Sequence, residues 1–211
     1  MNNFIKRILS LYYFYISNRI KIYKYKNIND YKKIQIKANL RKEKQVWASE
    51  NSVKYVSNIL RKEIQNIKKG MCHGVRNGAE ILYFKKYLGK KIRIVGTELS
   101  HTAKNYPNTI QWDFHKIKKK WLSSFDFIYS NALDHSYNPD LCIRNWVSCL
   151  TEKGLCVIEW NRNNAENNST DPFGASLGGL KAIIMKHARV VLLKKLKDGN
   201  IHRFFFFIQR L

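Results

Sequence analysis

Residues 125–160 read FDFIYSNALDHSYNPDLCIRNWVSCLTEKGLCVIEW, and this stretch decides the fold. Residues 125–130 are a short run rich in apolar and aromatic side chains, as a buried strand requires. Pro139 is typical of a first helical turn, where its missing N–H costs nothing, and predicts a helix to about Leu150. A second apolar run follows at residues 155–160. Strand, helix and strand in this order form a βαβ unit, so we expect a parallel sheet.

The same alternation continues on both sides of this stretch. We predict further strands at 69–73, 92–96 and 109–113, and helices at 46–67, 77–88 and 176–188. The chain ends in two β-rich runs, 190–196 and 203–209, joined around Asp198-Gly199, a hairpin signal. Strands joined by a tight turn are antiparallel. The predicted fold class is therefore α/β: a seven-stranded, mainly parallel sheet with a C-terminal antiparallel hairpin and helices on both faces.

Length and composition indicate one packed domain with an N-terminal extension. The chain has 211 residues, of which 45% are hydrophobic. Residues 1–45 are dominated by Lys, Ile, Tyr and Asn, and we assign them to a basic, aromatic extension. About the first 40 residues lie outside the predicted sheet, so we expect them to be dispensable for ligand binding. Residues 46–211 form the domain. The formal net charge is +24, which suits a face for nucleic acid or anionic lipid. The lysines are scattered through every segment, however, which favours a compositional bias.

The start of the chain predicts an amphipathic helix within residues 4–20. One helical face carries the apolar side chains Ile5, Ile8, Leu9, Tyr12, Ile16 and Ile20. A basic, aromatic helix of this kind can lie on a membrane surface, which would make the protein peripheral at a membrane. It can equally dock on the domain or stay a flexible extension. No apolar run in the sequence is long enough to span a bilayer.

The cysteines indicate no metal centre. None of Cys72, Cys142, Cys149 and Cys156 forms a Cys-x-x-Cys pair, so zinc-site spacing is absent. We interpret them as reduced core thiols of a cytoplasmic protein.

Ligands of open α/β sheets bind at the carboxyl ends of the strands, so the residues at those ends are the candidates for binding and catalysis. The first predicted strand ends in the loop 72–78. Gly74 and Gly78 permit tight turning and a close approach of backbone to ligand, and Arg76 and Asn77 lie between them. The loop opens a helix, whose N-terminal amides favour carboxylate or phosphate groups.

Acidic residues lie at the ends of the second and third predicted strands. Glu98 lies about 20 residues past the glycine loop, where a carboxylate can accept both ribose hydroxyls of a nucleoside. Its alternative role is that of a solvated loop carboxylate. Asp113 can accept an adenine amino group while the neighbouring Phe114 covers the ring.

The fourth predicted strand is followed by the polar cluster Asn131, Asp134 and His135. Side chains at this position face the same crevice and can contact cofactor or substrate. His135 can alternatively cap the next helix or pack against it.

These motifs together resemble the class I S-adenosylmethionine-dependent methyltransferases. Residues 69–160 carry most of the likeness. Residues 125–130, followed by Leu133-Asp134-His135-Ser136-Tyr137-Asn138-Pro139, are similar to the fourth-strand signature of that family. The resemblance implies a Rossmann-like fold and S-adenosylmethionine as cofactor. The cofactor contacts that it implies are Gly74, Arg76, Asn77, Gly78, Glu98, Leu99, Asp113, Phe114 and Asn131.

The first strand departs from the family pattern, which has an acid at the end of that strand. Here the strand ends Gly70-Met71-Cys72-His73-Gly74, without an acid. Arg76, in the loop that follows, can meet the methionine carboxylate as a bidentate partner.

The activity that the resemblance implies is methyl transfer to a small-molecule or glycan acceptor, without a metal. Asp134 and His135 are the candidate catalytic bases. The polar loop 161–179 either covers the substrate or is a disordered connection. RNA methylation is the first alternative because of the charge, but no aromatic-flanked amine-recognition motif and no appended RNA-binding module supports it. A non-catalytic basic binding protein on the same fold is the second.

Overall fold

The computed structural model describes residues 3–211. Its helices are α1 (Asn3–Tyr15), α2 (Ile28–Arg41), α3 (Glu50–Glu63), α4 (Ala79–Leu88), α5 (Pro139–Ser148) and α6 (Leu177–Met185). Its strands are β1 (Ile20–Ile22), β2 (Lys69–His73), β3 (Arg93–Glu98), β4 (Thr109–Gln111), β5 (Phe125–Ser130), β6 (Leu150–Asn161), β7 (Phe173–Ala175), β8 (Ala188–Asp198) and β9 (Ile201–Arg210). Four short 3-10 helices lie at His101–Asn105, Lys119–Trp121, Leu133–His135 and Arg162–Ala165.

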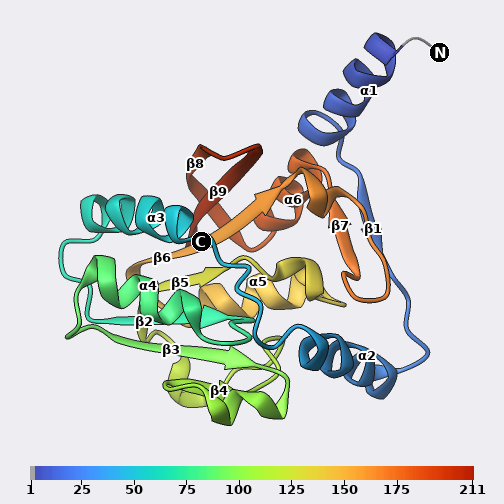
Figure 1. The fold of residues 1–211 in the computed structure, drawn as a ribbon. Coiled ribbons are helices and arrows are strands. Elements are labelled where there is room, and N and C mark those ends of the chain that lie inside the picture. The colour runs from blue at the N-terminus through green and yellow to red at the C-terminus, as the bar shows by residue number, and fades with distance from the viewer. Residues whose placement is uncertain (1–2) are drawn as a thin grey trace.

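Seven strands form the central sheet in the order β4-β3-β2-β5-β6-β9-β8 (Figure 1). Neighbours from β4 to β6 are parallel, and β9 is antiparallel to both β6 and β8. Gly199 turns the β8–β9 hairpin with a φ of +59°, which glycine adopts without strain. The predicted fold class is therefore confirmed, including the antiparallel hairpin.

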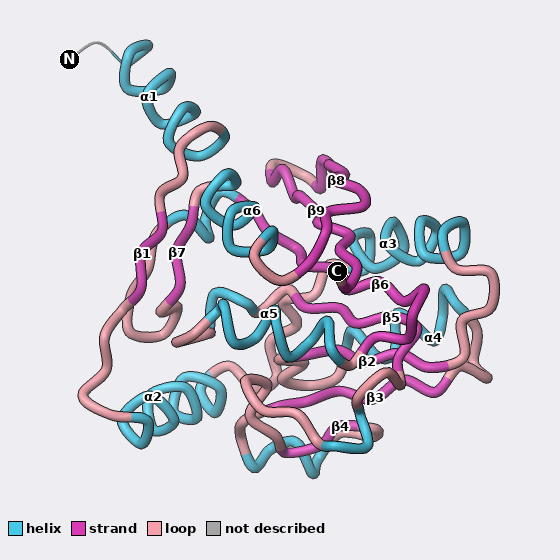
Figure 2. Tube along the Cα trace, turned by 180° about the vertical axis from the view of Figure 1, so that it is seen from behind, coloured by secondary structure: helices cyan, strands magenta, loops and turns pink. Residues whose placement is uncertain are grey.

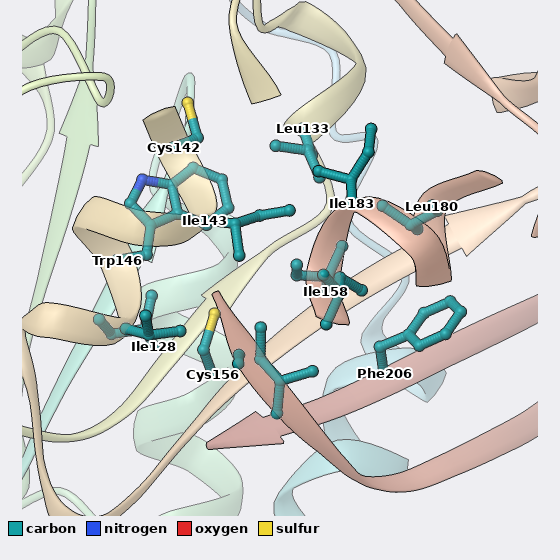
Figure 3. Close-up of a cluster of buried hydrophobic side chains, with 14 of the residues drawn as sticks. Ile128, Leu133, Cys142, Ile143, Trp146, Cys156, Ile158, Leu180, Ile183 and Phe206 are labelled. Carbon is teal, nitrogen blue, oxygen red and sulfur yellow. The ribbon is translucent and has the colours of Figure 1, made fainter. Parts of the chain in front are cut away.

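Helices cover both faces of this sheet, because alternate strand residues point to opposite sides (Figures 1 and 2). In β9, Phe205 and Phe207 belong to the core beneath α3 and α4, whereas Phe204 and Phe206 pack towards α5 and α6. Figure 3 shows the core on the α5 and α6 side, where Trp146 packs among aliphatic side chains and the thiols of two cysteines. All four cysteines are buried without a disulfide, as core thiols should be.

Element boundaries differ from the predicted ones for local reasons. α4 begins at Ala79 instead of residue 77, because Gly78 is its N-cap with a left-handed φ of +73°. α3 begins at Glu50 instead of residue 46, because the Ser49 hydroxyl caps it by accepting the Ser52 N–H. β6 begins at residue 150, five residues early, through a register shift against β5.

The N-terminal segment forms no part of the seven-stranded sheet, but it is tied to the domain. β1 pairs with β7, inside the predicted 161–179 loop, as a separate two-stranded sheet. Phe14, only 2% exposed, packs beside Phe204. α2 lies beyond the carboxyl ends of the parallel strands, and most of α1 projects from the body (Figures 1 and 2). None of the helices within residues 3–211 combines the length and apolarity that crossing a bilayer needs.

Candidate active site

Two adjoining cavities lie at the carboxyl ends of β2 to β6. The inner cavity, about 60 Å³ in volume, is lined by Glu98, Asp113 and Phe114 and by residues of α2. The outer chamber, about 350 Å³, is lined by Asn131, Asp134, Glu80 and residues after β6. Five residues belong to both linings: Lys42, Gly74, Arg76, His135 and Asp171. The two spaces therefore form one crevice at the ligand-binding edge of an open α/β sheet.

The glycine loop forms the floor between the two cavities. Gly74 has a φ of +74°, and a Cβ there would lie 2.5 Å from Cβ of Ala132, so the position excludes any side chain. The backbone N–H of Gly74 donates to the carbonyl of Thr97. Arg76 also lies in the left-handed region, with a φ of +44°. The loop is thus held tightly against the ends of β3 and β5.

Glu98 fastens the loop and keeps acceptor capacity for a ligand. Its carboxylate accepts the backbone N–H of Arg76 at 3.0 Å and that of Ser100 at 2.9 Å. The side chain is 7% exposed, and this burial raises the pKa of the carboxyl. A carboxylate offers about four acceptor positions, so the two amides leave room for hydroxyl donors in the inner cavity.

Asp113 has one oxygen held and one oxygen free. Its Oδ1 accepts the backbone N–H of His115 at 3.0 Å and lies 2.7 Å from Nδ1 of the same residue. Burial acts to raise the pKa of Asp113, but the hydrogen bonds and charge of His115 lower it overall. Its Oδ2 is buried and has no partner among residues 3–211. A buried carboxylate oxygen without a donor is costly, so this atom fits an amino group supplied by a ligand.

The remaining predicted cofactor residues divide into three groups. Leu99 and Phe114 line the inner cavity, and Asn131 lines the outer chamber. Asn77 lines the outer chamber too, but its amide donates to the carbonyls of Glu43 and Gln45 and so holds the connection between α2 and α3. Gly78 lines neither cavity and serves as the helix cap of α4.

His135 stands where the two cavities meet, between two carboxylates. Its Nδ1 lies 2.8 Å from the carbonyl oxygen of Thr170 and 3.4 Å from Oδ1 of Asp171. Since a carbonyl only accepts, this contact places a proton on Nδ1, and in the neutral ring the lone pair is then on Nε2. Asp134 accepts a hydrogen bond from Asn164 through Oδ2, its Oδ1 is buried without a partner in the described chain, and burial raises its pKa.

Several lining residues were not predicted from sequence. α2 contributes Tyr31, whose hydroxyl donates to the carbonyl of His135 at 3.1 Å, and Gln35, whose amide donates to that of Thr170 at 2.9 Å. These contacts give α2 a part in shaping the crevice, which the expectation that about the first 40 residues are dispensable did not include. Glu80, Glu159 and Arg203 line the outer chamber. For Glu159 and Arg203, a charged residue inside an apolar strand pattern is the sequence signal that could have found them.

The crevice is acidic although the chain is strongly basic. It is lined by seven of the chain's 15 acidic residues but by three of its 39 lysines and arginines. The seven acids are Glu80, Glu98, Asp113, Asp134, Glu159, Glu166 and Asp171. The crevice thus favours ligands that carry positive charge or donate hydrogen bonds.

Comparison with known proteins rests on structure alone. No family model matches the chain, and no curated protein matches its sequence. One similar solved structure is the 1,6-didemethyltoxoflavin-N1-methyltransferase of Burkholderia thailandensis with bound S-adenosylhomocysteine. It aligns with a TM-score of 0.70 at 13% sequence identity, and the alignment covers 93% of this chain and 97% of that one. The N-methyltransferase NodS of Bradyrhizobium japonicum, also with S-adenosylhomocysteine, aligns at 0.59 and 14% identity, over 83% and 98%.

A third structure widens the range of chemistry. The cyclase SpnF aligns with a TM-score of 0.64 at 8% identity, over 92% of this chain and 100% of that one. One fold hosts different reactions, so these likenesses establish the architecture and leave the activity to the site. The chain has the Rossmann-like, seven-stranded fold of these methyltransferases.

Proposed function

We propose that the protein is a methyltransferase that binds S-adenosylmethionine in the crevice and methylates a small-molecule or glycan acceptor. The observation that carries the proposal is the free, buried Oδ2 of Asp113, a residue that lines the same inner cavity as Glu98. These two carboxylates suit the adenine amino group and the ribose hydroxyls, with Leu99 and Phe114 as apolar walls. Arg76, whose Nε is buried without a partner within residues 3–211, suits the methionine carboxylate.

In the proposed reaction the protein has to position the acceptor and remove its proton. The sulfonium of the bound cofactor supplies an electrophilic methyl group. His135 and Asp134 hold the acceptor in the outer chamber. As the acceptor takes the methyl group and the S–CH3 bond breaks, Nε2 of His135 takes the acceptor's proton. Asp171 and Asp134 stabilise the imidazolium that results. The acidic lining favours an amine or polyhydroxyl acceptor over a polyanion such as RNA.

Calorimetry with S-adenosylhomocysteine tests cofactor binding. Asp113→Asn should weaken it by about 1.5–3 kcal/mol, the range for hydrogen bonds to a charged group, and hence roughly 10- to 100-fold. Asp140→Asn, on the surface of α5, is the matched control. Absence of binding to the wild-type protein would refute the proposal.

Transfer of a labelled methyl group tests the acceptor class. Label should enter the small-molecule fraction of a cell extract, and His135→Ala should reduce this transfer without changing the affinity for S-adenosylhomocysteine. Label that enters only the RNA fraction favours the first alternative, and cofactor binding without any transfer favours the non-catalytic one.

We further propose that α1 docks the protein on an anionic membrane surface. Its side chains Ile5, Ile8 and Tyr12 are about half exposed. The first 29 residues contain no acid but six lysines and arginines. Because each copy carries this positive charge, two copies repel each other, whereas an anionic bilayer satisfies both the charge and the apolar side chains.

Vesicle co-sedimentation tests this docking. The protein should bind phosphatidylcholine vesicles that contain phosphatidylglycerol, and Ile8→Asp should abolish the binding. Leu82→Asp, at a leucine of α4 that is 64% exposed against 50% for Ile8, should leave it intact. Equal binding to vesicles without phosphatidylglycerol, or no binding at all, contradicts the proposal.

A further inference from the structure

The outer chamber contains a buried acid that the proposed reaction does not use. Glu80, in the first turn of α4, is 5% exposed, and its Oε2 has no hydrogen-bond partner in the described part of the chain. It lines the chamber together with Gly74, Arg76 and Asn131. An ionised carboxylate in such a place is costly unless a positive group meets it.

The other buried acid nearby is already satisfied. Oε2 of Glu159 accepts the hydroxyl of Tyr129 at 2.6 Å, and its Oε1 accepts NH1 of Arg203 at 2.5 Å. Arg203 donates a second hydrogen bond, to Asp198, at 3.0 Å. Of these two buried glutamates, Glu80 is therefore the one that retains an unused oxygen.

The end of β2 supplies no negative charge to the same space. His73 is 2% exposed, its Nδ1 lies 2.8 Å from the Thr97 hydroxyl, and its ring stacks on Trp146. Burial, with a smaller effect from His115, lowers the pKa of His73 to about 3, so the ring is neutral. A ligand cation that binds beside the glycine loop must therefore find its negative partner on another element than β2.

Arg76 and Glu80 present unpartnered buried atoms of opposite charge in one chamber. An α-amino acid carries both complementary charges on one carbon. We propose that Glu80 binds the ammonium of the cofactor's methionine end while Arg76 binds its carboxylate. This inference rests on the proposed function, because it concerns the same ligand.

The electrostatic surroundings of Glu80 agree with this role. Burial raises its pKa to about 8. The charged and titratable groups that face it are Arg76, Glu159, Tyr129 and Cys72. Glu80 therefore holds a proton at neutral pH in the free protein, and an arriving ammonium takes the place of that proton.

The test compares two ligands. 5′-Methylthioadenosine keeps the nucleoside and the sulfur but lacks the amino-acid end of S-adenosylhomocysteine. Glu80→Gln should weaken S-adenosylhomocysteine binding at least tenfold and change methylthioadenosine binding less than twofold. Asp113→Asn should weaken both. An equal effect of Glu80→Gln on the two ligands, or no effect on either, overturns the assignment.

A second measurement does not depend on the variant's folding. At pH 7, calorimetry of the wild-type protein in buffers of different ionisation enthalpy should show release of close to one proton with S-adenosylhomocysteine and none with methylthioadenosine. Equal proton release with both ligands contradicts the role of Glu80. If the wild-type protein binds methylthioadenosine but shows no preference for S-adenosylhomocysteine, the Glu80 assignment fails and the nucleoside site stands; if it binds neither ligand, the proposed function fails as well.

Discussion

Gly74→Ala is the sharpest test of the loop that shapes the crevice, because two separate penalties can be read from the structure. Alanine at a φ of +74° pays the left-handed cost of about 1–2 kcal/mol. The new Cβ, 2.5 Å from that of Ala132, forces an overlap whose relief costs about 1–3 kcal/mol. We therefore expect the free energy of unfolding to fall by roughly 2–5 kcal/mol.

The double variant Gly74→Ala with Ala132→Gly separates the two penalties. It removes the overlap and keeps the backbone strain. The free energy of unfolding should therefore rise again by about 1–3 kcal/mol, reduced by the small cost of the new glycine. Urea unfolding of the wild-type protein and the three variants gives the coupling energy. Additive effects of the two substitutions would refute the contact between Gly74 and Ala132.

Three further predictions concern the crevice. Glu98→Ala should weaken S-adenosylhomocysteine binding by about 1–3 kcal/mol, measured by calorimetry, and lower the melting temperature because the amides of Arg76 and Ser100 lose their acceptor; unchanged affinity in a folded variant contradicts the ribose contact. A chain that begins at Arg41 should melt earlier and bind S-adenosylhomocysteine more weakly, since it lacks Tyr31 and Gln35; full retention of both properties would restore the view that the extension is dispensable. Burial raises the pKa of Glu80 to about 8 from an ordinary 4.5, so the folded state binds the extra proton and its contribution to stability is lost as pH rises from about 4.5 to 8. The melting temperature of Glu80→Gln should therefore fall less over this range than that of the wild-type protein. Parallel falls of the two melting temperatures would contradict the pKa shift.

The strands of the central sheet were predictable because their signal is local. The runs at 69–73 and 125–130 are bounded by turn residues, and β2 and β5 occupy these same residues. Glu98 and Asp113 could be singled out for a similar reason. A residue directly after a parallel strand must lie at the carboxyl edge of the sheet, whatever the rest of the chain does.

The features of the fold and site that the sequence did not predict depend on contacts between segments distant in sequence. Nothing within residues 28–41 indicates that Tyr31 meets the backbone of His135, 104 residues later. The pairing of β1 with β7 joins two three-residue strands that are too short to show a period. Glu80 looks like an ordinary acid of a first helical turn, and only the packing of α4 on the sheet reveals that its carboxylate is buried.

The contrast between the acidic crevice and the basic exterior bears on which class of acceptor the crevice admits. A polynucleotide that placed one base in the outer chamber would bring its phosphates against the rim, where Glu166 and Asp171 have side chains 62% and 39% exposed. Arg19 and Lys21 pair with Glu166 and offset its charge, so it is chiefly the Asp171 carboxylate that opposes a phosphate there. A small amine or a neutral polyhydroxyl meets no such barrier and gains from the same carboxylates. The proposed function therefore assigns different partners to the basic exterior and the acidic crevice: an anionic surface to the exterior around α1, and a cofactor and an acceptor that donate hydrogen bonds or carry positive charge to the crevice.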